Sequence, residues 1–313
     1  MMTKDMSKKM YTLKPNQDYR DDSLFPNVDL SPEDLLEDTA KHYDDCYWDY
    51  LRVWCNRRNL ALHYGHWTSD EKYNHHQALL NKNQLLYDLA GIKSSDHVLD
   101  AGCGIGGSSI WMAETHQNRV TGITVSAKQT RYAKKHAERH GVADKVNFEV
   151  SDFCNTPFED ESFDIIWGLE SVCYAVDKAD FLREAYRLLR KGGKVVVCDG
   201  FFAREEFDQR EWDANMAFFN GWAVPNLATR RDFNEKLEQE NFKSIAVHEV
   251  TAATMPSSDY MYKISKWLRP VQTFREWFGL SSKAQTANFE VGFAQNIMFR
   301  EALVEYCIFT AEK

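Results

Sequence analysis

The segment HVLDAGCGIGG at residues 97–107 constrains the fold of this chain most strongly. Its short apolar start predicts a β-strand, and an acid, Asp100, follows. Four glycines then occur within six residues, at positions 102, 104, 106 and 107, before a segment predicted to be helical. A strand that turns through glycines into a helix brings bare backbone and a helix N-terminus close to a bound ligand. The segment therefore predicts a ligand-binding βα turn.

Two classes of cofactor use such a turn, and the neighbouring residues distinguish them. The glycines at 102, 104 and 107 also satisfy the dinucleotide fingerprint. However, a carboxylate at Asp100 repels pyrophosphate, and the acid that grips an NAD ribose about 20 residues later is missing from VTGITVS (120–126). Asp100 instead suits a cofactor that carries an ammonium and a sulfonium group. We therefore expect S-adenosylmethionine (SAM); a nucleotide-binding oxidoreductase or an inactive SAM-binding protein is the alternative of another class.

The rest of the chain alternates short β-runs with helical patterns, which predicts an α/β fold. We expect a Rossmann-like, doubly wound and mostly parallel sheet with a helical, aromatic-rich cap. The predicted strands are 97–100, 119–124, 146–150, 163–168, 194–199, 243–250 and 303–311. The predicted helices are 75–90, 107–115, 127–140, 178–190 and 230–240, and Lys191-Gly192-Gly193 is expected just after the fourth of them.

We divide the chain into a loose N-terminal arm (1–30), a helical lid (31–95), a SAM-binding core (96–250), an aromatic cap insertion (251–302) and a final core strand (303–313). The lid starts at Ser31-Pro32-Glu33-Asp34, a capping-box spacing with proline at the first helical position. Aromatic residues then recur at helical spacing, at positions 43, 47, 50 and 54. They indicate either a helix docked on the core or an aromatic lid over a substrate pocket, and the two interpretations are compatible.

Composition excludes several functions. A net charge of −9 argues against a nucleic-acid partner, because phosphate binding needs a basic face. No apolar run approaches the roughly 20 residues of a membrane span, so no stable membrane insertion is expected. Seven scattered cysteines without a CxxC pair indicate reduced thiols in a cytoplasm. The His63/His66 pair lacks a third ligand at metal-site spacing, so no metal is predicted. The composition leaves open whether the chain forms a homo-oligomer.

Candidate ligand contacts fall where the predicted strands end. In open parallel sheets, ligands bind at the carboxyl ends of the strands. At these ends the chain carries polar or aromatic side chains: Asp100, Thr124, Ser126, Asp152, Trp167 and Glu170. The alternative interpretation of each is an ordinary turn residue after a strand.

The chain resembles the class I SAM-dependent methyltransferases over roughly residues 60–200, and more loosely in the tail. The segments that carry the resemblance are HYGHW (63–67), VLDAGCGIGGSS (98–109), GITVSAKQ (122–129), PFEDESFDIIWGLES (157–171) and LLRKGGKVVV (188–197). It is closest to the small-molecule branch that contains tocopherol, sterol, sugar and prenyl diphosphate methyltransferases. The resemblance implies that Asp100, Gly102 and Gly104 line the methionine and ribose side of SAM, that Gln129 binds the ribose hydroxyls, and that Asp152 and Phe153 flank the adenine. We add Thr124, Ser126 and Trp167 as cofactor contacts.

The residues after the fourth core strand bear on the acceptor. Sugar O-methyltransferases of similar sequence carry two histidines where this chain has Cys173 and Tyr174. Prenyl diphosphate C-methyltransferases instead look like E-S-x-x-Y here, which this chain matches from Glu170 to Tyr174. The resemblance implies that Glu170 removes a proton from a methylated cation. We expect burial to raise its pKa and leave it mostly ionised near neutral pH.

These observations together predict a cytoplasmic SAM-dependent methyltransferase of secondary metabolism that acts on a lipophilic small molecule. C-methylation of a prenyl or aromatic acceptor is the main prediction, and O- or N-methylation of a sugar, phenol or amine is the alternative. The expected catalytic residues are Glu170, Tyr174 and, as a second candidate base, Asp199. The expected acceptor contacts are Tyr47, His63, Trp67, Trp222 and Trp267. No cluster of basic residues is obvious in the sequence, so acceptors without phosphate stay open.

Overall fold

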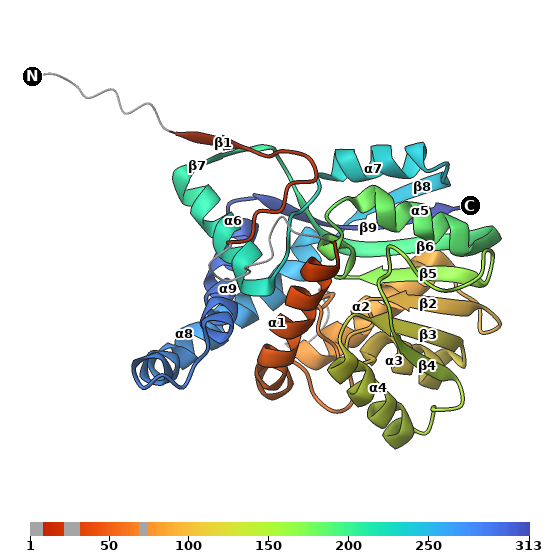
Figure 1. Cartoon of the computed structure of the whole chain (residues 1–313), viewed down its shortest axis with the longest axis horizontal. Coiled ribbons are helices and arrows are strands. Elements are labelled where there is room, and N and C mark those ends of the chain that lie inside the picture. The colour runs from red at the N-terminus through yellow and green to blue at the C-terminus, as the bar shows by residue number, and fades with distance from the viewer. Residues whose placement is uncertain (1–8, 22–31, 69–73) are drawn as a thin grey trace, which may run out of the picture.

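The computed structural model describes residues 9–21, 32–68 and 74–313 (Figure 1). Its central feature is a seven-stranded sheet in the order β4-β3-β2-β5-β6-β9-β8. The first five strands of this order are parallel, and β9 runs antiparallel between β6 and β8. The strands are β2 (His97–Ala101), β3 (Arg119–Thr124), β4 (Val146–Val150), β5 (Phe163–Leu169), β6 (Leu189–Phe202), β8 (Lys243–Glu249) and β9 (Val304–Glu312). The doubly wound, mostly parallel sheet expected from the sequence is confirmed.

Helices cover both faces of this sheet because successive strand residues point to opposite sides. Val98 of β2 belongs to one apolar core, and its neighbour Leu99 belongs to the other. The first core includes residues of α2 (His75–Ala90), α3 (Gly107–His116) and α4 (Ala127–His140). The second includes residues of α5 (Lys178–Leu188) and α7 (Arg230–Gln239). The helix α2, which we placed in the lid, therefore packs against the sheet as part of the core.

The predicted core elements agree with the observed ones within a few residues, and β6 differs most. It begins at Leu189 and includes Lys191-Gly192-Gly193, which we expected to follow a longer helix. Leu189 pairs with Phe163 of β5, and the register shifts between Phe163 and Ile165. This irregular pairing draws the glycine turn into the strand.

The prediction of a loose N-terminal arm is wrong for residues 9–21, the described part of that segment. β1 (Met10–Thr12) pairs antiparallel with β7 (Glu206–Asp208). The amide of Tyr19 donates to the Pro225 carbonyl at 2.9 Å, and the side chain of Arg20 is buried against Asp18. Pairing with a strand about 200 residues away cannot be seen in a short polar segment. The expected cap residue Ser31 lies outside the described residues.

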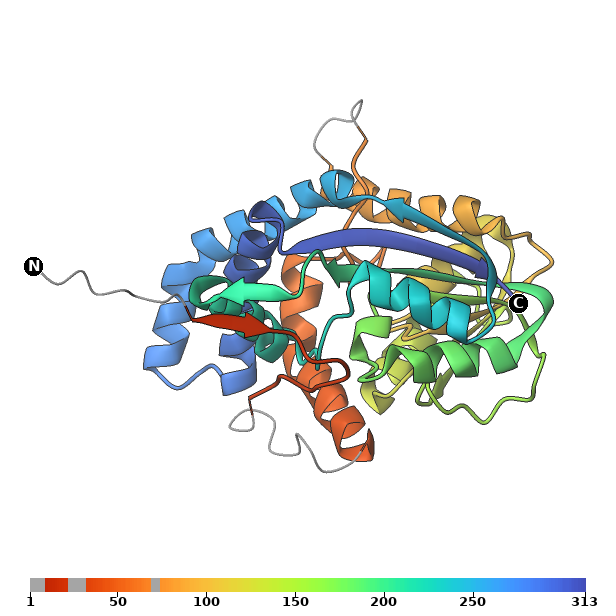
Figure 2. The ribbon, with the colours of Figure 1, turned by 90° about the horizontal axis from the view of Figure 1, so that it is seen from above.

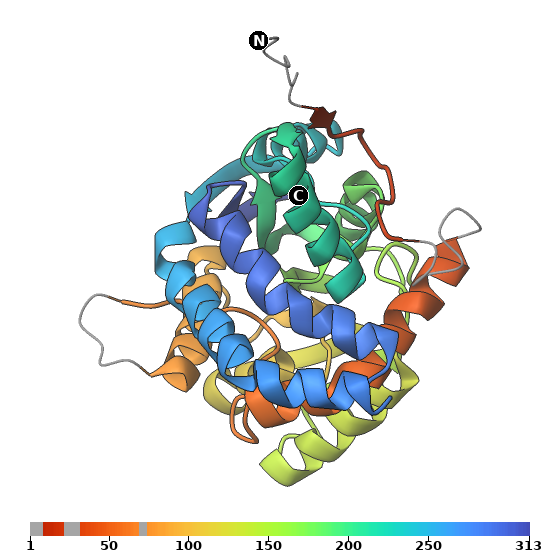
Figure 3. The ribbon, with the colours of Figure 1, turned by 90° about the vertical axis from the view of Figure 1, so that its left-hand side faces the viewer.

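A second layer of helices lies beyond the carboxyl ends of the parallel strands (Figures 2 and 3). It contains α1 (Pro32–Val53), α6 (Gln209–Trp222), α8 (Thr251–Trp277) and α9 (Lys283–Arg300). α9 packs against the other three helices of this layer. The 251–302 insertion is thus a long helical hairpin, and α6 was not predicted. Among the described residues, no helix combines the length and apolarity that crossing a membrane requires.

Candidate functional site

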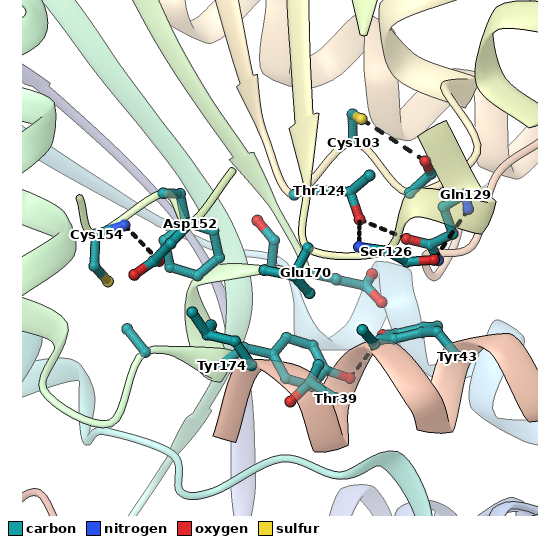
Figure 4. Close-up of a pocket in the computed structure, with 18 of the residues that line it drawn as sticks. Thr39, Tyr43, Cys103, Thr124, Ser126, Gln129, Asp152, Cys154, Glu170 and Tyr174 are labelled. Atoms are coloured by element: carbon teal, nitrogen blue, oxygen red, sulfur yellow. Dashed lines mark hydrogen bonds between the residues drawn. The ribbon is translucent and has the colours of Figure 1, made fainter. Parts of the chain in front are cut away.

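Two cavities meet above the carboxyl ends of β2, β3 and β5. One, of about 480 Å³, lies over the glycine turn and is called the polar cavity here. The other, of about 220 Å³, lies among α1, α6, α8, α9 and β9 and is called the aromatic cavity. Five residues line both cavities and form their common wall: Tyr43, Leu62, His63, Glu170 and Tyr174. Figure 4 shows Glu170 between Thr124 at the end of β3 and Gln129 of α4 on one side and the tyrosines at 43 and 174 on the other.

The glycine turn forms the floor of the polar cavity. Gly102 and Gly104 both have positive φ angles, of 90° and 55°, which glycine adopts without strain. A Cβ atom at Gly102 would lie only 2.4 Å from the Cβ of Ser171, so this turn closes tightly against the residue after Glu170. Asp100 is buried beside the turn and its Oδ2 accepts the Ser109 hydroxyl at 2.6 Å. Burial raises the pKa of Asp100 to about 6, so a cation bound here stabilises its ionised form.

Polar side chains after β3 and β4 continue the lining. The Thr124 hydroxyl donates to Gln129 Oε1 at 2.6 Å, which orients the amide at the first turn of α4. Ser126 caps this helix by accepting the Gln129 amide at 3.0 Å. Asp152 Oδ1 accepts the Cys154 amide at 2.8 Å, and Phe153 lies beside it in the lining. The cavity thus presents carboxylates, an amide and an aromatic ring from three consecutive strand ends.

Helix α1 covers the polar cavity and is held at both of its sides. Ser126 Oγ donates to Asp44 Oδ1 at 2.6 Å, and the Lys128 ammonium donates to the Asp44 carbonyl. On the other side, the hydroxyls of Tyr43 and Tyr174 are 2.6 Å apart. The residues of α1 that line the cavity are Tyr43 and, in the turns before it, Leu35, Leu36, Thr39 and Ala40.

Glu170 follows β5 with a positive φ of 51°, and its amide donates to the Cys198 carbonyl at 2.8 Å. Its Oε1 accepts the Tyr64 amide at 2.7 Å and also the Tyr306 hydroxyl. Burial raises the pKa of Glu170 to about 8, although these hydrogen bonds oppose the rise. The carboxyl group is therefore largely protonated at neutral pH in the ligand-free protein, contrary to our expectation of a mostly ionised group.

His63 presents a second polar atom to the common wall. Its Nδ1 lies 3.0 Å from the Tyr64 carbonyl, which can only accept, so Nδ1 carries the proton. Burial lowers the pKa of His63 to about 4, and the ring is neutral at pH 7. Its buried Nε2 then carries a lone pair, and no described residue donates a hydrogen bond to it.

The other two expected catalytic residues also lie at the cavities. Tyr174 donates its hydroxyl to the Trp222 carbonyl at 2.8 Å. Asp199 lines the aromatic cavity, but backbone amides engage both of its oxygens: Cys173 at Oδ2 and Gly200 at Oδ1, each at 2.9 Å. Burial raises the pKa of Asp199 to about 6. Asp199 is therefore more firmly fixed by the backbone than Glu170.

The aromatic cavity is apolar on most sides. Its rings come from the two flanks of the chain, from the segment after β5, and from α6 and β9: Tyr43, Tyr50, Trp54, Tyr64, Tyr174, Phe218, Trp222, Phe289, Phe299 and Tyr306. Among the described residues that line it, Arg275 is the only lysine or arginine. Such a cavity suits an uncharged lipophilic molecule, because a buried diphosphate needs several cations.

Four expected contacts lie elsewhere. Trp167 is fully buried in the middle of β5, opposite Asp100 and Val196, and lines neither cavity. The ring of Tyr47 stacks on that of Tyr132, with centroids 4.3 Å apart. Trp67 donates to Ser257 Oγ at 2.8 Å, outside both linings. Trp267 points outward from α8. The remaining expected cofactor contacts line the polar cavity, while His63 and Trp222 line the aromatic one.

Two residues behind Glu170 were missed. Tyr306 of β9 reaches Glu170, and the ammonium of the fully buried Lys82 lies 4.3 Å from the Tyr306 ring centroid and 3.0 Å from Thr254 Oγ1. Lys82 lies one helical turn from both Ala78 and Leu86, so a lysine on this apolar stripe was a readable signal. Tyr306 gives no such signal. Nearly every residue of β9 is buried, so one more aromatic residue in this strand does not stand out from its neighbours.

Comparison with known proteins agrees with this geometry. The family model described as a methyltransferase domain matches residues 99–197. The chain is 30% identical over 257 residues to 27-O-demethylrifamycin SV methyltransferase of Amycolatopsis mediterranei, covering 80% of this chain and 89% of that one. It is 40% identical over 172 residues to geranyl diphosphate 2-C-methyltransferase of Saccharopolyspora erythraea, covering 55% and 59%. Among solved structures, geranyl diphosphate C-methyltransferase from Streptomyces coelicolor, in complex with Mg2+, geranyl diphosphate and S-adenosyl-L-homocysteine, has a similar fold. Its TM-score is 0.68 at 21% identity, covering 90% of this chain and 98% of that one.

Proposed function

The chain belongs to the SAM-dependent methyltransferases, and on this premise we propose that it methylates a carbon atom of an uncharged, lipophilic small molecule held in the aromatic cavity. The observation that carries the proposal is the common wall. A polar cavity at the strand ends and an aromatic cavity under the helical cap meet at Glu170, His63 and Tyr174. A methyl group can therefore pass between two molecules held in separate environments.

The residues of the polar cavity fit SAM. Asp100 lies buried beside a glycine turn and offers a carboxylate to a cationic group. Gln129 is oriented by Thr124 and can bind ribose hydroxyls, while Asp152 and Phe153 can meet an adenine. Gly104 leaves room for close approach, since a Cβ atom there would already lie 3.3 Å from Leu62 Cδ1.

The aromatic cavity supports the lipophilic acceptor. Its rings offer apolar contact, and its described lining holds one arginine. This supports a prenylated or aromatic acceptor without a diphosphate. Two relatives are named for 27-O-demethylrifamycin SV and for geranyl diphosphate, and the second of these molecules joins an apolar prenyl chain to a charged diphosphate.

Bound SAM supplies an electrophilic methyl group. Transfer of this methyl group to a double bond of the acceptor would leave a positive charge on the acceptor. The rings of Tyr64, Tyr174 and Trp222 stabilise such a charge by about 0.5–2 kcal/mol each. Glu170 then accepts a proton from the carbon beside the cation. Positive charge on either side of the common wall favours the ionised carboxylate that this step needs, because it lowers the pKa of Glu170.

One observation favours O-methylation as a second candidate. His63 lines both cavities, and its neutral Nε2, which has no hydrogen-bond partner among the described residues, can accept the proton of a phenol or alcohol during methyl transfer to that oxygen. In that case His63, and not Glu170, is the base.

We further propose a cytoplasmic location and no nucleic-acid partner. All seven cysteines are free thiols, and six of them are buried. The net charge of −9 opposes binding to phosphate backbones.

The experiment is a transfer assay with SAM labelled in its methyl group. Three acceptor sets are compared: uncharged prenylated phenols and polyketides, prenyl diphosphates, and polar sugars or amines. Label in an organic-soluble product of the first set supports the proposal, and magnetic resonance of that product separates C-methyl from O-methyl. Label only in the diphosphate or the polar set overturns the proposed acceptor class.

A further inference from the structure

Helix α8 carries a stripe of apolar side chains that faces solvent. Trp267, Val271 and Phe274 follow one another at spacings of four and three, which places them on one face of the helix, and Phe278, the residue that caps its end, follows after four more. Their exposed fractions are 79%, 56%, 53% and 56%. Beside this stripe lie Trp277 and Leu280, exposed by 83% and 62%. These six residues are called the outer stripe. Soluble monomers rarely expose so many large apolar side chains together.

The outer stripe points away from the rest of the protein. On the opposite face of α8, Ser265 and Gln272 are buried, and Ser265 Oγ would lie 1.9 Å from a Cβ atom at Gly292 of α9. The α8–α9 hairpin projects beyond the sheet on the side away from the C-terminus (Figures 1 and 2). Packing of α8 on α9 therefore leaves the stripe uncovered.

The charge around the stripe is the reverse of the chain's average. Residues 260–283 contain five basic side chains and one acidic one, Glu276, in a chain of net charge −9. Lys263 lies one turn before Trp267 on the same face, and Lys263, Lys266 and Lys283 are exposed. Glu276 is nine residues after Trp267, which places it on the opposite face. A second copy of this surface would bring like charges together, whereas an anionic partner would not.

The aromatic cavity reaches the same helix. Leu268, Val271 and Arg275 line it, and Val271 is also part of the exposed stripe. A lipophilic molecule that leaves an apolar phase at the stripe would therefore meet the cavity lining at Val271. A shallow hollow lined by Tyr260, Lys263, Ile264 and Trp267 continues the apolar surface towards the start of α8.

We propose that the outer stripe docks this protein reversibly on an anionic lipid surface. Tryptophan and phenylalanine side chains enter the boundary between headgroups and acyl chains, and the three exposed lysines contact the headgroups. Such docking is peripheral, in keeping with the finding that no described helix can span a membrane. It brings the cavity lining at Val271 close to lipid-dissolved molecules.

The test is co-sedimentation of the whole chain with vesicles. Vesicles of phosphatidylcholine with phosphatidylserine should sediment the protein, whereas phosphatidylcholine alone should bind it much less, and added salt should release it. The double variant Lys263→Glu/Lys266→Glu should reduce the partition coefficient about ten-fold or more. Trp267→Ser/Trp277→Ser should reduce it as well. The control Lys134→Glu/Lys135→Glu, on exposed positions of α4, should bind as the original chain does.

Circular dichroism and SAM affinity show that each variant is folded. Because binding is measured without turnover, its outcome is separate from that of the proposed reaction. Absent binding to the mixed vesicles overturns the proposal. It is also overturned if the original chain dimerises with rising concentration and the Trp267→Ser/Trp277→Ser variant does not, because a second copy then covers the stripe.

Discussion

The hydroxyl of Tyr43 on α1 lies 2.6 Å from the hydroxyl of Tyr174, which follows β5. Tyr174 already donates its proton to the Trp222 carbonyl, so Tyr43 is the donor in this pair. The pair joins the helix that covers the polar cavity to the wall of the aromatic cavity. Closure of α1 over one molecule is thereby linked to the place where the other is held.

Tyr43→Phe removes this donor and leaves the Tyr174 hydroxyl bonded to Trp222. A lost hydrogen bond of about 0.5–1.5 kcal/mol predicts roughly two- to ten-fold weaker SAM binding by isothermal titration. Tyr50→Phe is the matched control, since Tyr50 lines only the aromatic cavity and bonds Asn288. Equal SAM affinity in both variants would show that the Tyr43 hydroxyl does not hold α1 over the polar cavity.

Asp100→Asn should weaken SAM binding about ten-fold or more, because the neutral amide loses a charged contact worth about 1.5–3 kcal/mol. Asp164→Asn serves as the control. Asp164 bonds the His97 amide at the opposite ends of these strands, so SAM affinity should stay unchanged there. Unchanged affinity in Asp100→Asn would argue against a cation beside this carboxylate.

Gly104→Val should abolish SAM binding while the protein stays folded. Both Gly104 and Gly141 have positive φ angles, so valine strains the backbone at either position. Only Gly104 lines the polar cavity; a Cβ atom at Gly141 has no atom within 4 Å. Gly141→Val should therefore lose a similar amount of thermal stability but keep its SAM affinity. Loss of affinity in both variants would point to misfolding rather than to a blocked cavity.

Glu170→Gln should reduce turnover about 10²–10⁴-fold and keep SAM affinity within a few-fold, because glutamine retains the shape but cannot accept the proton. Asp199→Asn should have the smaller effect, since amides already engage both oxygens of Asp199. If Glu170→Gln remains nearly as active while His63→Gln is inactive, the base is His63 and O-methylation is favoured.

The thermal stability of the ligand-free protein should fall as the pH rises from about 6.5 to about 8. In the folded state the pKa of Glu170 is about 8, well above the usual 4.5, so the folded protein still holds a proton that the unfolded chain has lost. The buried His42, His63, His75 and His136 act in the opposite direction but below this range, because burial lowers each pKa to about 4. In Glu170→Gln, the melting temperature should depend less steeply on pH over this range. An equally steep decrease would show that another group causes it.

Much of the core was predictable from sequence because it depends on local patterns. The β2–α3 glycine turn, the capped α4 and the strands up to β5 follow from periodicity and from residues adjacent in the chain. The lining of the polar cavity could be predicted for the same reason, because its residues come directly after successive strands. Asp100, Ser126 and Asp152 could thus be named without a structure.

The acceptor side was less predictable because residues far apart in the chain build it. Trp67 and Trp267 resemble Trp222 in sequence terms, yet only Trp222 lines the aromatic cavity. The β1–β7 pairing and the contact of Tyr306 with Glu170 also join distant segments.

The sequence by itself determined the sheet, the cofactor class and the order of strand-end residues, because alternation and turn chemistry act over a few residues. Only the tertiary structure decided which aromatic rings face the cavity, that Glu170 is held by Tyr64 and Tyr306, and that one face of α8 stays uncovered. Those outcomes depend on how α1, α6, α8 and α9 pack together. Each of these helices has apolar residues on more than one side, so only the packing settles which side is buried.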